Sequence, residues 1–90
     1  MYLVATGDGR LYTGITTDVA RRLEEHRAGK GARFLRGRAP LELVYHCRVG
    51  ARGKALRVES LLRRRPREDK LEVVASAPSR RALLRRLGCA

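Results

Sequence analysis

A glycine-rich loop between two tyrosine-bearing segments constrains the fold of this chain more than any other feature. The segments 2–5 and 11–16 read as short strands joined through Gly7-Asp8-Gly9. Side chains alternate between the two faces of a strand, so the length of the loop decides which of them share a face. A two-residue turn would place Tyr2 and Tyr12 on opposite faces. A three-residue loop, with its last glycine in the left-handed conformation, places them on the same face. We predict the three-residue loop.

The three-residue loop also fixes how the two strands pair. It sets Tyr2 opposite Gly14 and Val4 opposite Tyr12. Because Gly14 has no side chain, we expect open space beside Tyr2, enough for a substrate backbone to approach.

The residues after the second strand predict a helix over 18–28. Asp18 is a natural N-cap for it, and glycines follow its expected end. At ~100° per residue, His26 falls beside Val19 on the apolar stripe of this helix, and Arg22 falls at the edge of the stripe. The opposite face is expected to be solvated surface, carrying Glu24, Glu25 and Arg27.

The segment 29–40 is basic and interrupted by glycines, so any helix in it is expected to be short. Its single aromatic residue, Phe34, is surrounded by the four cations Lys30, Arg33, Arg36 and Arg38. The segment can be a flexible arm that grips phosphates, or Phe34 can anchor an otherwise plain loop to the core. The two readings are compatible, and both stay open.

The second half of the chain predicts one more strand and three helices. Alternation over 41–49 indicates a half-buried third strand, antiparallel to the hairpin, with His46 pointing to solvent. Its single apolar face comprises Leu41, Leu43, Tyr45, Cys47 and Val49. Helices are expected over 52–65, over 67–75, and from Pro78 or Ser79 to Leu87, with Pro66 ending the first and Gly88 ending the last.

One carboxylate falls on an apolar helix face. Glu59 lies between Ala55 and Leu62 on the helical wheel of the segment 52–65. A carboxylate that faces the core is costly unless it is paired or protonated. A salt bridge to one of the many arginines is the plain structural interpretation, and a functional role is the other.

The charge balance indicates a polyanionic partner. The chain has 21 Lys and Arg against 9 Asp and Glu, a net charge of +12 on 90 residues. Neutralising phosphates with such cations releases counterions, so nucleic acid is the expected partner. A membrane surface is not, because no helix pairs a basic face with a bulky aromatic one.

The sequence also bears on the compartment. No apolar run approaches the ~20 residues that span a bilayer, and no leader peptide is recognisable. Cys47 and Cys89 have no neighbouring cysteines in a zinc spacing, so we expect free thiols without a metal role. These features favour a cytoplasmic location.

Two tyrosines, an arginine, a histidine and one inward carboxylate together suit phosphodiester hydrolysis. A phenol or phenolate can deprotonate water, and a guanidinium can stabilise charge on the phosphorane. A carboxylate can hold one hard divalent cation. None of these residues is diagnostic alone.

The chain resembles the GIY-YIG nuclease domain. Three runs carry the resemblance: YTGITTDVARRLEEH at 12–26, GKGAR at 29–33 and ALRVE at 55–59. The similarity extends over residues 1 to about 74 and is greatest to the small stand-alone YhbQ-like bacterial group. It implies an α+β fold, with a three-stranded antiparallel sheet packed with helices. The last fifteen or so residues lie beyond the resemblance, and the helix expected there is an extra C-terminal helix. We expect a nuclease-like domain over 1–76 and a helical extension packed on it over 77–90.

The resemblance also implies roles for the site residues. Tyr2 would act as general base with Tyr12 assisting, and Arg22 would stabilise the transition state. His26 matches a histidine that is common on this helix. Glu59 would bind one divalent cation, Mg or Mn.

The implied activity is that of a metal-dependent endonuclease, with DNA favoured over RNA as its substrate and DNA repair or processing as its setting. Cations from the basic segment and the later helix would contact the nucleic acid: Lys30, Arg33, Arg36, Arg38 and Arg63. The alternative is a catalytically weak or inactive nucleic-acid-binding module of the same fold. Ribosome-associated RNA binding also fits the charge, but it leaves Glu59 unexplained.

Overall fold

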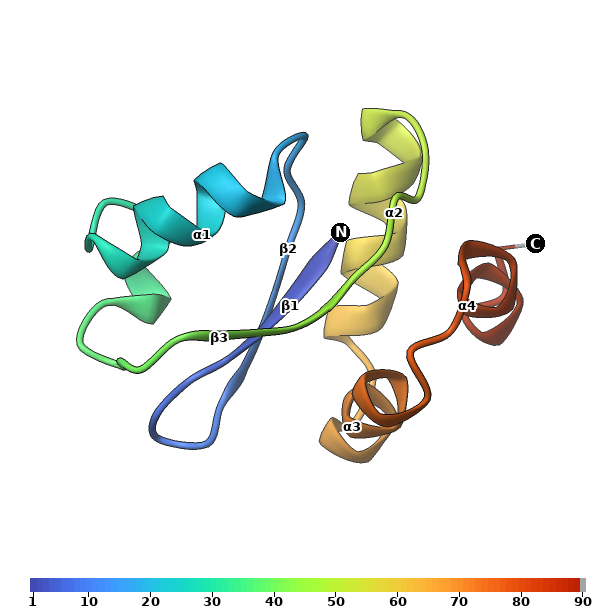
Figure 1. The fold of residues 1–90 in the computed structure, drawn as a ribbon. Helices are drawn as coiled ribbons and strands as arrows, with labels where there is room; N and C mark the ends of the chain where they lie inside the picture. The colour runs from blue at the N-terminus through green and yellow to red at the C-terminus, as the bar shows by residue number, and fades with distance from the viewer. Residues whose placement is uncertain (90) are drawn as a thin grey trace.

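The protein has the α+β architecture that the sequence predicts, seen in a computed structural model that describes residues 1–89 (Figure 1). Its antiparallel sheet has the strand order β2-β1-β3, so the first strand of the chain is central. The elements follow in chain order as β1 (Tyr2–Ala5), β2 (Leu11–Gly14), α1 (Val19–Arg27), a 3₁₀ turn η1 (Arg33–Leu35), β3 (Glu42–His46), α2 (Arg52–Arg63), α3 (Arg67–Ser76) and α4 (Arg80–Arg86).

The hairpin has the predicted register. Tyr2 lies opposite Gly14, and Val4 lies opposite Tyr12. The backbone N–H of Thr6 donates to the carbonyl oxygen of Arg10 at 2.9 Å, which closes the three-residue loop. The last loop residue, Gly9, has φ +82°, a conformation that side-chain-bearing residues rarely adopt. The loop therefore places both tyrosines on one face of the sheet, as expected.

Helices cover both faces of the sheet, with α1 on one side and α2, α3 and α4 on the other (Figure 1). On the α1 side, Tyr2 and Val4 are buried together with Leu35 of η1. On the other side, Leu3 and Tyr45 pack against apolar side chains of α2, α3 and α4. The alternating side chains of β1 thus contribute to two small cores, and Tyr2 is only 2% exposed.

The expected single apolar face of the third strand is wrong. Leu3 pairs with Tyr45 but Val4 pairs with Leu43, so Val44 has no opposite residue on β1. Such an extra residue is a β-bulge. Side chains beyond it point to the opposite face of the sheet from the one that strict alternation would give them. Leu41 and Leu43 therefore belong to the α1-side core, whereas Tyr45, Cys47 and Val49 lie in or against the opposite core. His46 is exposed, as expected.

The helix ends lie close to their predicted positions. The Asp18 side chain accepts from the Arg21 backbone N–H and caps α1. The helix α4 begins after Ser79, whose hydroxyl accepts from the Ala82 backbone N–H, and Gly88 with φ +76° follows its end.

The last helix is tied to the rest of the structure. Leu83, Leu84 and Leu87 are buried in the core that α2 and α3 share. The Tyr45 hydroxyl donates to the carbonyl oxygen of Pro78 at 2.7 Å, which joins β3 to the start of α4. The division of the chain into 1–76 and 77–90 stays a prediction.

Candidate active site

Three aromatic side chains meet on the face of the sheet that α1 covers. The ring centroids of Tyr2 and Tyr12 are 6.3 Å apart, and those of Tyr2 and His26 are 5.8 Å apart. Tyr12 and His26 complete the triangle at 5.7 Å, in an edge-to-face arrangement. The neighbouring strands β1 and β2 carry the two tyrosines, and α1 carries His26. These elements therefore bring the three predicted site residues together.

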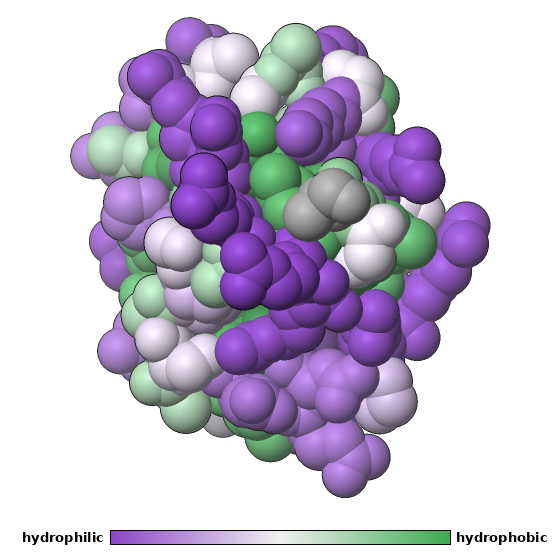
Figure 2. All heavy atoms as spheres, turned by 90° about the vertical axis from the view of Figure 1, so that its right-hand side faces the viewer, coloured by the Kyte–Doolittle hydropathy of each residue, from purple (hydrophilic) through white to green (hydrophobic). Residues whose placement is uncertain are grey.

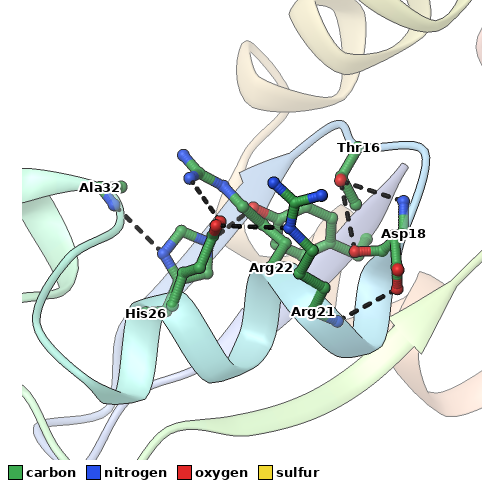
Figure 3. Close-up of polar contacts among 8 residues, drawn as sticks. Thr16, Asp18, Arg21, Arg22, His26 and Ala32 are labelled. Carbon is green, nitrogen blue, oxygen red and sulfur yellow. Dashed lines mark hydrogen bonds and ion pairs between the residues drawn. The ribbon is translucent and has the colours of Figure 1, made fainter.

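His26 is held at both ring nitrogens. It is 3% exposed, and its Nε2 lies 2.7 Å from the Tyr2 hydroxyl oxygen. The backbone N–H of Ala32 donates to Nδ1 at 3.1 Å (Figure 3). A backbone N–H can only donate, so Nδ1 must be the unprotonated nitrogen. A neutral His26 then carries its proton on Nε2 and donates it to the Tyr2 oxygen.

The ionisation of this pair follows from its surroundings. Burial lowers the pKa of His26, and the positive charge of Arg22 lowers it further. The imidazole is therefore held neutral. Burial raises the pKa of Tyr2 to about 12, the neighbouring Tyr12 adds to the rise, and the Arg22 guanidinium opposes it. Tyr2 is thus a neutral phenol whose proton points away from His26.

Arg22 is half-buried on α1 and is paired. Its Nη1 lies 3.1 Å from Oε1 of Glu25, and Glu25 also lies 3.6 Å from the Nε of Arg21. This hydrogen bond raises the pKa of Arg22 and lowers the pKa of Glu25. The expectation that Glu25 is plain solvated surface is wrong, although the spacing of three residues from Arg22 is a recognisable helical pair. Arg27 is exposed, as expected, and its guanidinium also donates to the carbonyl oxygen of Leu41 at 3.0 Å.

Glu59 lies on the inner part of α2, as its helical position indicates. Its side chain is 14% exposed, and its Oε1 accepts from Nη1 of Arg63 at 3.0 Å. The salt-bridge interpretation of this residue is therefore confirmed. The Glu59 carboxylate contributes a small rise to the pKa of Tyr2, after burial and Tyr12, so the two groups lie within electrostatic range. Arg63 is 65% exposed and is free to turn away.

The metal-binding capacity of the site is limited. Within residues 1–89, no three His, Cys, Asp or Glu side chains converge on one metal position. One partly buried carboxylate suits Mg²⁺, which keeps several waters and shares its ligands with substrate phosphates. The residues present therefore fit a single cation held by Glu59.

Two glycines pack directly against the site. A Cβ on Gly14 would lie 2.5 Å from the hydroxyl oxygen and Cζ of Tyr2, and a Cβ on Gly31 would lie 2.0 Å from Nδ1 of His26. The space beside Gly14 is therefore filled by the Tyr2 ring and is not open to a substrate backbone, contrary to expectation. Gly31 and the Ala32 N–H were not predicted as site elements, because the contact of a loop with a distant helix residue leaves no local pattern.

The sequence model of the GIY-YIG catalytic domain matches residues 1–72. This chain belongs to the GIY-YIG family. Its fold is therefore of the nuclease type, and nucleic acid is the substrate class that the family implies. Within residues 1–89, no helix is both long and apolar enough to cross a bilayer.

Curated relatives place the chain more narrowly. It is 51% identical over 79 residues to the UPF0213 protein YE0453 of Yersinia enterocolitica, an alignment that covers 88% of this chain and 81% of the relative. It is 50% identical over 78 residues to UPF0213 proteins of Yersinia pestis and Yersinia pseudotuberculosis, with 87% of this chain and 82% of each relative covered. These are the small YhbQ-like proteins that the sequence resemblance indicated. No solved structure matches the chain.

The basic segment of this GIY-YIG domain lies along one side of the aromatic triangle. Leu35 of η1, at 2% exposed, anchors the segment to the core, so the reading in which Phe34 is the anchor is wrong. The Phe34 ring is 41% exposed and stacks on Tyr12, with centroids 6.0 Å apart and planes 23° apart. Arg38 is half-buried against this ring, whereas the other three predicted cations are exposed: Lys30, Arg33 and Arg36.

Positive charge is not confined to the site of the GIY-YIG domain. Figure 2 shows hydrophilic side chains over most of the face formed by α2, α3 and α4, with apolar side chains visible between them. Exposed arginines of this part of the chain include Arg67, Arg80, Arg81, Arg85 and Arg86. The sequence prediction of a basic arm near the site therefore describes only part of a broadly cationic surface.

Proposed function

We propose that this protein is a metal-dependent endonuclease that hydrolyses phosphodiester bonds in DNA. The observation that carries the proposal is the Tyr2 hydroxyl, which a neutral His26 holds beside Tyr12 with the Arg22 guanidinium close by. A buried tyrosine with only a structural role needs one hydrogen-bond partner for its hydroxyl. It needs neither a hydrogen-bond donor of fixed direction nor a cation near that hydroxyl. The donor and the cation both favour the phenolate and so oppose the effect of burial, which raises the pKa of Tyr2.

In this proposal Tyr2 is the general base. Tyr2 would first lose its own proton to solvent, and the resulting phenolate would take a proton from the attacking water. The Nε2–H of His26 donates to the same oxygen and would stabilise its negative charge. His26 is not itself a proton acceptor here, because Nε2 already carries a proton and Nδ1 accepts from Ala32. Tyr12, half-buried against Tyr2, would assist in positioning the water.

Arg22 would stabilise the negative charge of the transition state. It lines a surface hollow of about 300 Å³ together with Thr16, Thr17, Arg21 and Arg52, in which a phosphate would sit. The carboxylates of Asp18 and Glu25 line the same hollow. Glu25 holds the guanidinium in place before substrate arrives. Preorganised donors of this kind lower the barrier because they need no rearrangement during the reaction.

Glu59 would hold one divalent cation, Mg or Mn. When bound, the cation would polarise the scissile phosphate and neutralise part of its charge. Glu59 must exchange its bond to Arg63 for this role, and the exposure of Arg63 makes the exchange inexpensive. Arg63 would then be available to contact the nucleic acid, as would the cations of the basic segment: Lys30, Arg33, Arg36 and Arg38.

DNA repair or processing in the cytoplasm is the setting that we propose. The second candidate is a nucleic-acid-binding module of weak or absent activity. A pKa of about 12 for the proposed base, and an Arg22 neutralised by Glu25, favour that alternative.

Direct assay separates the two candidates. The purified protein is incubated with single-stranded, duplex and branched DNA in Mn²⁺, in Mg²⁺ and in EDTA, beside the Glu59→Gln variant. The nuclease proposal predicts cleavage that needs the metal and is lost in Glu59→Gln. Salt-dependent binding without cleavage under any of these conditions would support the binding module, and cleavage that persists in Glu59→Gln would contradict the metal assignment.

A further inference from the structure

We propose that Phe34 and Arg38 form a stacking site for one unpaired nucleobase of the bound strand, at the edge of the aromatic triangle. This inference rests on the proposed function, because it takes the strand to lie across Tyr12. It adds a contact to a base, whereas the proposed active site contacts only phosphate.

Phe34 has the properties of a stacking platform. Among the described residues, the exposed large hydrophobic side chains are those of Phe34, Leu56 and Leu71, and Phe34 is the aromatic one. Its ring stacks on that of Tyr12, with centroids 6.0 Å apart and planes 23° apart, and it carries the Arg38 guanidinium over it. A base stacked there and a phosphate at Arg22 would meet the same aromatic cluster, because Tyr12 also contacts the Tyr2 and His26 pair and Arg22 acts on Tyr2.

The ring is held in place before any ligand binds. The next residue, Leu35, is buried in the core and fixes the 3₁₀ turn. Arg38 donates from Nε to the carbonyl oxygen of Phe34 at 2.7 Å, and its Cζ lies 4.4 Å from the ring centroid. Arg38 is itself held by an ion pair with Asp8 of the hairpin loop. A fixed ring loses little conformational entropy when a base stacks on it.

A purely structural role explains this arrangement less well. Leu35 already anchors the segment, so the core does not require an aromatic ring at position 34. The flat guanidinium of Arg38 lies over the Phe34 ring, so the ring supports a planar cationic surface on which a base can stack. Arg33 and Arg36 bring exposed cations to the flanks. Aromatic rings interleaved with arginines are the common arrangement for binding single strands.

The site selects among nucleic-acid structures. Bases inside a regular duplex are stacked on their neighbours and present no free face, so an unpaired base in a single strand, at an end or in a bulge is required. The geometry therefore predicts a preference for strands with an unpaired base next to the cleaved bond.

The test uses the full-length Glu59→Gln protein in Mg²⁺, so that binding is measured without cleavage. Oligonucleotides that carry one 2-aminopurine scanned along the strand, or one abasic position, are titrated against it and against Glu59→Gln proteins with Phe34→Leu or Phe34→Tyr. We expect quenching of 2-aminopurine at one position, retained by Phe34→Tyr and lost in Phe34→Leu. Phe34→Leu should weaken binding by up to roughly 5- to 150-fold, the range that alanine substitution gives for one stacked base. The matched control is Leu56→Ala, which removes an exposed apolar side chain from α2 and should leave both readouts unchanged.

The abasic strand completes a double-mutant cycle. The protein that retains Phe34 should bind the abasic strand more weakly than the intact strand. The Phe34→Leu protein should bind the two strands equally. Unchanged quenching in Phe34→Leu, or an equal abasic effect on both proteins, would overturn the stacking site. The proposed nuclease function fails separately, if wild-type protein cleaves no substrate while the quenching persists. An absence of binding to every oligonucleotide would overturn both.

Discussion

The hydroxyl oxygen of Tyr2 and Nε2 of His26 lie 2.7 Å apart in the core between β1 and α1. Because the Ala32 N–H occupies Nδ1 of the same imidazole, this contact has a fixed direction, from His26 to Tyr2. One residue thus ties the central strand, the first helix and the basic segment together. The same bond that supports the fold supports the proposed base.

Replacement of His26 by Ala should lower the free energy of unfolding. It removes both hydrogen bonds and leaves the Tyr2 hydroxyl without its partner, at a cost of roughly 1–3 kcal/mol for the unsatisfied groups. Urea denaturation followed by circular dichroism measures the change. The control is Glu24→Ala, an exposed position on the same helix. A loss for His26→Ala no larger than that of the control would contradict the structural role of the imidazole.

The stability of the protein should fall as the pH drops below about 7. The pKa of His26 is lowered in the folded state, so between its unfolded value of about 6.5 and the folded value the unfolded chain binds a proton that the folded chain does not. The free energy of unfolding therefore decreases as pH falls through this interval. Melting temperatures from pH 8 to pH 5 should show a downward slope that is shallower in His26→Ala. Parallel slopes for the two proteins would count against a neutral, buried His26.

Substitution of Gly14 by Ala should displace the Tyr2 ring. The new Cβ would lie 2.5 Å from the Tyr2 hydroxyl oxygen, closer than non-bonded atoms approach. Overpacking of this kind costs typically about 1–3 kcal/mol. The matched control is Gly53→Ala in α2, where a Cβ meets no atom within 4 Å and should stabilise the helix by up to about 1 kcal/mol. Thermal melts of the two variants should therefore shift in opposite directions, and a Gly14→Ala protein as stable as the wild type would show that the Tyr2 ring adjusts freely.

These variants concern features that the sequence predicted unequally well. The hairpin register followed from loop length, because a left-handed glycine and strict alternation leave one pairing that puts both tyrosines on one face. The bulge at Val44 did not follow, because the alternation over 41–49 is unbroken and the extra residue shows only against the partner strand. Glu59 was found through its helical position, which a wheel displays. The Ala32 N–H that orients His26, and the stacking of Phe34 on Tyr12, arise from tertiary contacts of a loop that has no periodicity.

Arg22 and its sequence neighbour Arg21 should behave differently when replaced by Ala. Both changes remove one positive charge, so they should weaken non-specific binding to DNA about equally. Arg22 is half-buried beside the Tyr2 phenol, whereas the Arg21 side chain is 76% exposed. Loss of a preorganised donor costs about 10²–10³ in rate. The single-turnover cleavage rate of Arg22→Ala should therefore fall by that factor, while the rate of Arg21→Ala stays close to that of the wild type. Equal losses of cleavage rate in the two variants would show that Arg22 contributes only its positive charge.

The measurement that tests the central claim most directly is the single-turnover cleavage rate of Tyr2→Phe. The variant removes one oxygen atom and keeps the ring that packs in the core, and its melting temperature checks that the fold is retained. General-base catalysis is worth about 10²–10⁴ in rate, so with saturating protein and Mg²⁺ or Mn²⁺ we expect a loss in that range. The wild-type rate should also rise with pH, because the pKa of Tyr2 lies at about 12. A Tyr2→Phe rate within about threefold of the wild type would contradict the assignment of Tyr2 as the base.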